Sequence, residues 1–144
     1  MKMNCNPVPT VDERINDIRS RTAEIVNDDI LPNEQKLWAA RHEGESMEHR
    51  REVLELRAQI KQKVKKAGLW APHLPEEYGG MGLDFLAHAY MNEVLAYAIG
   101  AASLFGVVAP NSGNQSILAK YGTEAVSYTH LPRWRRKWPV RKGS

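Results

Sequence analysis

The sequence predicts an all-α fold: a bundle of about five helices, followed by a disordered basic tail. Apolar residues recur at intervals of three and four along several segments, which is the period of an amphipathic helix. No segment shows the sustained alternation of apolar and polar residues that is typical of a half-buried strand. Prolines and glycines separate the periodic segments. Residues 1–125 are therefore interpreted as one helical domain, and residues 126–144 as a tail without a fold of its own.

The first helix is predicted over residues 11–29. Thr10 and Glu13 have the spacing of a capping box, in which each side chain accepts a hydrogen bond from the other residue's backbone N–H. Apolar residues follow at near-helical spacing among charged ones, as on a surface helix of a bundle. These apolar residues are Val11, Ile15, Ile18, Ile25, Val26 and Ile30. Pro32 is expected to end the helix, because proline has no N–H to continue the hydrogen-bond ladder.

A second long helix is predicted over residues 48–66. It follows a polar loop at residues 33–47 that contains a short helical turn near residues 34–40. The other face of the long helix is rich in lysine and arginine, which indicates a solvated surface. Gly68 is expected to stop it, since glycine readily adopts the left-handed conformation that ends many helices. Its buried stripe is predicted to consist of Val53, Leu56, Ile60, Val64 and Ala67.

Three shorter helices are predicted after a stretch rich in proline and glycine at residues 67–83. Asp84 is positioned to cap a helix over residues 85–100. The small apolar residues 101–109 predict a buried helix, and a Pro-Asn-Ser-Gly turn separates it from a last short helix over residues 114–121. The buried face of the first of these helices is predicted to carry Leu86, Tyr90, Val94 and Tyr97.

The net charge of +3 is unevenly distributed along the chain. Residues 126–144 contain six of the 20 lysines and arginines and no acidic residue, so residues 1–125 carry 14 basic and 17 acidic residues. This mildly acidic body gives no reason to expect a nucleic-acid partner. In the tail, arginines alternate with two tryptophans, a combination that can bind nucleic acid or an anionic membrane. We interpret the tail instead as non-native sequence.

The cellular location is predicted from features that the sequence lacks. No apolar run is long enough for a membrane span, and the first residues resemble neither a secretory signal nor an organelle transit peptide. The single cysteine, Cys5, cannot form an internal disulfide and is compatible with a reducing compartment. We therefore predict a cytoplasmic protein, with mitochondrial and peroxisomal locations left open.

No residue of this chain is predicted to be catalytic or to bind a metal. Glu76 and Glu77 are adjacent in a loop, where two carboxylates point in different directions, so Glu76 is expected to cap backbone amides of the turn. The five histidines include no i,i+4 pair and have no cysteine partners. Glu93 lies in an apolar helix and is expected to be partly buried, with a role either at the helix end or in a salt bridge.

Three stretches occur in the order found in acyl-CoA dehydrogenases. They are the loop AGLWAPHLPEEYGGMGL at residues 67–83, a helical segment with Tyr90, Asn92, Glu93 and Val94, and APNSGNQSILAKYGTEA at residues 109–125. Asn92 stands where the family more often has an acidic residue. The chain resembles the N-terminal helical domain of this family, in its long-chain-type branch, truncated before the domains that follow.

The resemblance implies a flavoenzyme with a helical N-terminal, a β-barrel middle and a helical C-terminal domain. FAD lies between the last two, and the reaction is α,β-dehydrogenation of a fatty acyl-CoA. The implied partners are the acyl-CoA substrate, electron-transfer flavoprotein and further copies of the chain. Because the glutamate base and most flavin contacts belong to the other domains, no catalytic or cofactor-binding residue is assigned, and the fragment is predicted to be inactive.

The contribution that the resemblance implies for this domain is part of the wall around the acyl chain, near residues 101–114. The candidate residues are Leu104, Phe105, Ala109, Pro110 and Asn114. The alternative is ordinary core packing for Leu104 and Phe105 and turn formation for Asn114. The competing function for the whole chain is a non-catalytic helical interaction module, whose basic tail binds an acidic partner.

Overall fold

The structure is a computed structural model that describes residues 2–39, 46–108 and 111–122. Over these ranges it is all-α, as predicted, and contains no strand. The predicted domain boundary at residue 125 and the predicted tail lie outside the described residues. The helices are α1 (Glu13–Ile25), α2 (Glu34–Ala39), α3 (Met47–Lys66), α4 (Phe85–Leu95), α5 (Ala101–Leu104) and α6 (Asn111–Tyr121), with short π or 3-10 turns at η1 (Val26–Ile30), η2 (Leu31–Asn33) and η3 (Glu76–Tyr78).

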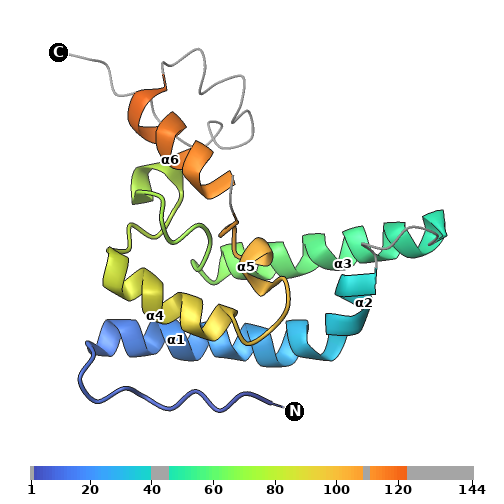
Figure 1. The fold of residues 1–144 in the computed structure, drawn as a ribbon, viewed down its shortest axis with the longest axis horizontal. Helices are drawn as coiled ribbons and strands as arrows, with labels where there is room; N and C mark the ends of the chain where they lie inside the picture. The colour runs from blue at the N-terminus through green and yellow to red at the C-terminus, as the bar shows by residue number, and fades with distance from the viewer. Residues whose placement is uncertain (1, 40–45, 109–110, 123–144) are drawn as a thin grey trace.

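Helices α1 and α4 lie side by side and form the most extensive helix pair of the described chain (Figure 1). Helix α5 packs on both α3 and α4, and α2 contacts α3. Helix α6 lies beyond the loop that joins α3 to α4, on the side away from α1 (Figure 1). Since α4 contacts both α1 and α5, and α5 contacts α3, the pair α4 and α5 connects α1 to α3. None of the described helices is long and apolar enough to cross a membrane.

One apolar core joins these helices. Among the described residues, Phe105 is the largest side chain that is fully buried. The predicted stripe of α3 is confirmed, with Leu56 and Ala67 partly buried at its edge. The main buried members of the core are Ile18, Ile25, Val26, Ile30, Val53, Ile60, Val64, Met91, Val94, Leu95, Leu104 and Phe105.

The predicted capping box at the start of α1 is wrong. Asp12 is the N-cap, and its Oδ1 accepts a hydrogen bond from the Arg14 N–H at 2.7 Å. Thr10 does not cap the helix because the chain still turns there, with the Val11 N–H donated to the Val8 carbonyl at 3.2 Å. At the other end Pro32 does not stop the helical path. It lies in the first turn of η2, where a missing N–H leaves no hydrogen bond unmade, and the chain continues into α2.

Helix α4 exposes residues that the spacing predicted to be buried. Asp84 caps it as predicted, accepting from the Ala87 N–H at 2.8 Å. Leu86 and Tyr97, however, are 59% and 53% exposed. The prediction failed because the helix carries apolar residues on more than one of its faces. Spacing alone therefore does not select the face that packs on α1. The helix also ends at Leu95, well before residue 100; its buried residues are Ala87, Met91, Val94 and Leu95.

Helix α5 is shorter and α6 longer than predicted. Helix α5 ends at Leu104, and Gly106, with φ of 80°, turns the chain away from it. Helix α6 begins at Asn111, and the Ser112 N–H already donates to the Val108 carbonyl at 2.9 Å. Asn114 therefore lies inside a helix, and the alternative that it forms a turn is wrong.

Candidate functional site

The loop at residues 67–83 folds back on itself between α3 and α4. The Met81 N–H donates to the Ala71 carbonyl at 3.3 Å, and the Gly82 N–H donates to the Leu74 carbonyl at 2.8 Å. Ala71 has φ of 50°, a left-handed conformation that costs a non-glycine residue about 1–2 kcal/mol. This conformation is held in place because the Ala71 N–H donates to the Phe105 carbonyl at 2.9 Å. The loop is thus tied both to itself and to the end of α5.

The acidic pair of this loop is exposed, in the 3-10 turn η3. It is the backbone carbonyl of Glu76, rather than its carboxylate, that accepts the Gly79 N–H, at 2.9 Å. Gly79 has φ of 78°, a conformation that glycine adopts without strain. The two carboxylates therefore lie outside any enclosed site.

A hollow of about 450 Å³ opens between the end of α4 and α5. Asn92 supplies its one polar side chain, and the other lining residues are apolar or glycine. Gly100, with φ of 80°, allows the tight turn that brings α5 back against α4. The arrangement suits an alkyl group better than a charged one. The lining residues are Asn92, Leu95, Ala96, Ala98, Ile99, Gly100, Ala102 and Val107.

Of the residues predicted to line an acyl chain, none that the structure describes lines this hollow. Leu104 and Phe105 are 1% and 0% exposed and belong to the core, and Asn114 is exposed on α6. Ala109 and Pro110 lie outside the described residues. The hollow is instead lined by small neighbours in the same region, such as Gly100 and Ala102, which the sequence did not single out. Their signal was the run of small residues, which was interpreted only as a buried helix.

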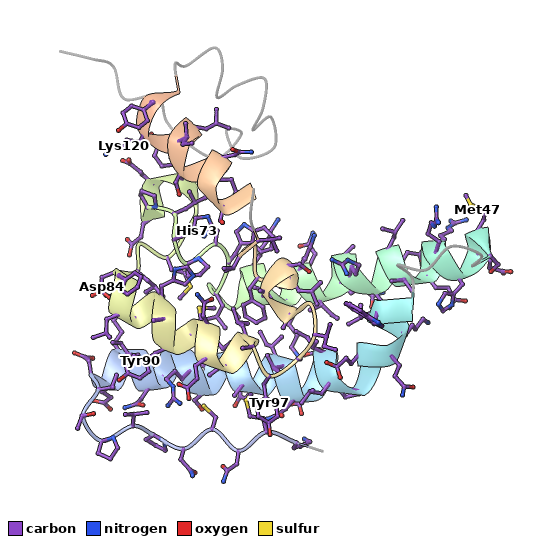
Figure 2. All side chains as sticks on the ribbon, in the orientation of Figure 1. Met47, His73, Asp84, Tyr90, Tyr97 and Lys120 are labelled. Carbon is purple, nitrogen blue, oxygen red and sulfur yellow. The ribbon has the colours of Figure 1, made fainter. Side chains whose placement is uncertain are left out.

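Two histidines that are far apart in sequence meet beside α6. His73 lies in the loop, close to α6 (Figure 2). The centroid of its ring is 6.1 Å from that of the His88 ring, on α4. The His73 Nε2–H donates to Gln115 Oε1 at 3.2 Å, which links the loop to α6. Burial lowers the pKa of both rings, and His73 lowers the pKa of His88 further. Within the described ranges, no group of three or more histidine, cysteine or acidic residues could hold a metal ion.

The predicted salt bridge of Glu93 is confirmed, but its predicted burial is wrong. Its carboxylate lies 3.4 Å from Arg19 Nη2, while its own side chain is 64% exposed. The buried partner is Arg19, whose side chain is 8% exposed and whose guanidinium lies 5.9 Å from the centre of the Tyr90 ring. The pair therefore links α1 to α4 at the edge of the core.

The chain is also similar in sequence to known proteins. The family model "Acyl-CoA dehydrogenase, N-terminal domain" matches residues 12–137. "Acyl-CoA dehydrogenase family member 10" of Mus musculus is 39% identical over 70 residues, which cover 45% of this chain and 6% of that protein. "Probable acyl-CoA dehydrogenase YngJ" of Bacillus subtilis (strain 168) is 36% identical over 84 residues, which cover 58% of this chain and 22% of that protein. No solved structure gives a significant match. The matched region is thus a small part of either relative.

Proposed function

Because the chain belongs to the acyl-CoA dehydrogenase family, matching its N-terminal domain over residues 12–137, we propose that it is the N-terminal helical part of a flavin-dependent enzyme that oxidises fatty acyl-CoA thioesters. The reaction introduces a double bond between the α and β carbons of the acyl group. The family match is the observation that carries this proposal. Since the chain covers 6% and 22% of its two relatives, the activity is proposed for the whole enzyme rather than for this domain alone.

In this proposal the hollow between α4 and α5 forms part of the wall around the acyl chain. Its apolar lining suits an alkyl chain, which gains about 0.8 kcal/mol for each methylene group that it buries. Leu104 and Phe105 contribute from within the core, where they hold α5 in position beside α4. This apolar character supports a fatty acyl group over a small polar acid as the substrate.

The hollow does not fit FAD. The pyrophosphate of a dinucleotide is bound by backbone N–H groups at a helix N-terminus or by cationic side chains, and the lining residues include no cation. We therefore assign the FAD contacts to parts of the enzyme beyond this domain and propose that the domain alone is inactive. Purified chain incubated with FAD and desalted should show no visible flavin absorbance, and stoichiometric retention of flavin would refute this assignment.

A pair of matched alanine variants tests the acyl wall. Ala96, which directly follows the end of α4, lines the hollow, whereas Ala89 is exposed on α4 outside it. Ala96→Leu should lower the affinity for decanoyl-CoA by about tenfold, since the added side chain displaces about two methylene groups. Ala89→Leu should leave the affinity unchanged. Calorimetric titration of both variants measures this, with free CoA as the reference ligand. Equal affinities in the two variants, or equal binding of CoA and decanoyl-CoA, would refute the role of the hollow.

Electron-transfer flavoprotein as electron acceptor, further copies of the chain as oligomeric partners and a cytoplasmic location are proposed together with this function. The family match favours it over a non-catalytic interaction module. A position in the long-chain-type branch stays a prediction.

A further inference from the structure

Residues 2–8 form an extended arm that lies along the outer side of α1 (Figure 1). Met3 is buried and Cys5 is partly buried against the core, while Lys2, Asn4 and Asn6 are exposed. This alternation is the period of a β-strand. The arm packs on a helix, however, and the described residues contain no strand with which it could pair.

Two asparagines hold the arm by its backbone. Asn16 Oδ1 accepts from the Val8 N–H at 2.9 Å, and Asn16 Nδ2 donates to the Val8 carbonyl at 3.0 Å. Asn27 makes the same pair of hydrogen bonds to Met3, at 2.7 and 2.9 Å. Each amide group thus satisfies both backbone groups of one arm residue, as a neighbouring strand would. These contacts depend on the arm's backbone and not on its side chains.

The spacing of the two asparagines matches the length of an extended chain. Asn16 in α1 and Asn27 in η1 are 11 residues apart, about 16.5 Å at the α-helical rise of about 1.5 Å per residue. Met3 and Val8 are five residues apart, about 16.5 Å at the extended rise of about 3.3 Å per residue. Eleven residues are also about three helical turns, so both amides leave the same face of the helix. This face therefore recognises a fixed length of extended backbone.

The buried guanidinium of Arg19 makes a further contact with the arm, between the two contacts made by Asn16 and Asn27. Arg19 Nη1 donates to the Asn6 carbonyl at 2.9 Å, and Arg19 is 6% exposed. Without the arm this guanidinium would lose an acceptor, and the partly apolar surface under Met3 and Cys5 would be open to water. The face of α1 thus requires an extended segment to cover it.

We propose that this face of α1 and η1, defined by Asn16, Arg19 and Asn27, is a binding groove for an extended segment, and that residues 2–8 of a second copy of the chain can occupy it in place of the chain's own. Backbone hydrogen bonds combined with contacts for alternate side chains are a general mode of recognising extended peptides. The arm of a second copy presents the same atoms in the same order, so an exchanged arm makes identical contacts. The equilibrium between the monomer, which binds its own arm, and the dimer with exchanged arms then depends on the hinge, the segment at residues 7–11 that joins the arm to α1.

The hinge between the arm and α1 favours opening. Pro7 and Pro9 flank Val8, and proline both fixes its own φ and keeps the preceding residue extended. The chain reverses in the turn from Val8 to Val11, whose central residues are Pro9 and Thr10 and in which the Val11 N–H donates to the Val8 carbonyl at 3.2 Å. A stiff segment beside a short reversal is an arrangement that favours exchange between copies.

The register provides a test of the exchange. About 2.2 helix residues correspond to each arm residue, which places Cys5 opposite Ala23. The Ala23→Cys chain is equilibrated under reducing conditions at about 0.01 mM and at about 1 mM, the effective concentration of a short tether. It is then oxidised and separated on a non-reducing gel. We expect an internal disulfide in the dilute sample and a covalent dimer that increases several-fold in the concentrated one.

A double variant that also carries Cys5→Ser is the control, and it should form neither product. An internal disulfide alone at both concentrations would overturn the exchange. Absence of any disulfide would overturn the register. A dimer that persists in the control would form without the arm and would equally overturn the proposal.

A second test does not depend on a new side chain at Ala23. Cys5 is the only cysteine in the chain, so its rate of modification by a thiol reagent reports release of the arm. Asn27→Asp removes the amide donor to Met3 and should raise this rate about tenfold. Asn33→Asp is the matched control, because it removes a similar donor to the Asp29 carbonyl away from the arm. Equal rates in the two variants would overturn the groove.

Discussion

Replacing Gly80 by alanine should strongly destabilise the fold. A Cβ atom at this position would lie 2.2 Å from the Leu74 carbonyl oxygen, 2.5 Å from the Leu74 Cβ and 2.6 Å from the Ala71 carbonyl oxygen. None of these atoms belongs to a flexible side-chain end that could rotate away. The loop itself must open to admit the methyl group.

The expected cost follows from what this opening breaks. Moving Gly80 outward strains the hydrogen bonds from Met81 to Ala71 and from Gly82 to Leu74, which are worth about 1 kcal/mol each. Overpacking adds about 1–3 kcal/mol. We therefore expect the free energy of unfolding to fall by about 3–5 kcal/mol, out of the roughly 5–15 kcal/mol typical of a folded domain.

Urea unfolding followed by far-ultraviolet circular dichroism measures this loss, and two other glycines serve as controls. Gly68 has φ of 70° but nothing within 4 Å of an added Cβ, so Gly68→Ala should cost only the strain of about 1–2 kcal/mol. Gly113 lies in α6 with equally open surroundings, so Gly113→Ala should stabilise the chain by about 0.5–1 kcal/mol. If Gly80→Ala costs no more than Gly68→Ala, the steric argument is refuted.

Phe105→Ala should lower the free energy of unfolding by about 3–5 kcal/mol in the same urea assay, because the side chain is fully buried; a loss under about 1 kcal/mol would contradict this. Arg19→Ala should lower the thermal midpoint more than Glu93→Ala, since the side chains are 8% and 64% exposed; equal shifts would mean that the ion pair, and not burial, dominates. Stability should fall as the pH drops below about 6.5, because burial lowers the pKa of His73 and His88, and the unfolded chain then binds more protons than the folded one. The urea midpoint measured against pH should show this decline, His88→Asn should reduce it, and an unchanged profile in that variant would contradict the assignment.

The sequence predicted those helices whose ends and faces are set by local chemistry. Asp84 and Gly68 act at short range, through a side-chain cap and a left-handed backbone, and both predictions are confirmed. The stripe of α3 could be predicted because its opposite face is strongly charged, which leaves one orientation for packing. Where both faces are apolar, as in α4, the neighbouring helix decides, and the sequence alone could not identify the buried face.

The features that were missed depend on contacts between distant residues. In the sequence, Asn16 and Asn27 cannot be distinguished from other polar residues on the surface of a helix. Their hydrogen bonds to the arm are evident only in the folded structure. His73 and His88 become neighbours only once the loop has folded back along α4. In both cases the residue types give no signal, because neither spacing nor propensity encodes a contact across the fold.

The loop at residues 67–83 identifies the family, yet its own side chains do not line the hollow. Its structural role explains the connection. The Ala71 N–H is bonded to the Phe105 carbonyl, and Gly106 lies so close to Trp70 that an added Cβ would be 3.0 Å from the indole ring. Both contacts fix the end of α5 against the loop, while α5 forms one side of the hollow and α4 the other. The contacts of Ala71 and Trp70 with Phe105 and Gly106 therefore connect the loop to one side of the hollow, and in the proposed enzyme we expect the opening of the loop by Gly80→Ala to alter acyl binding.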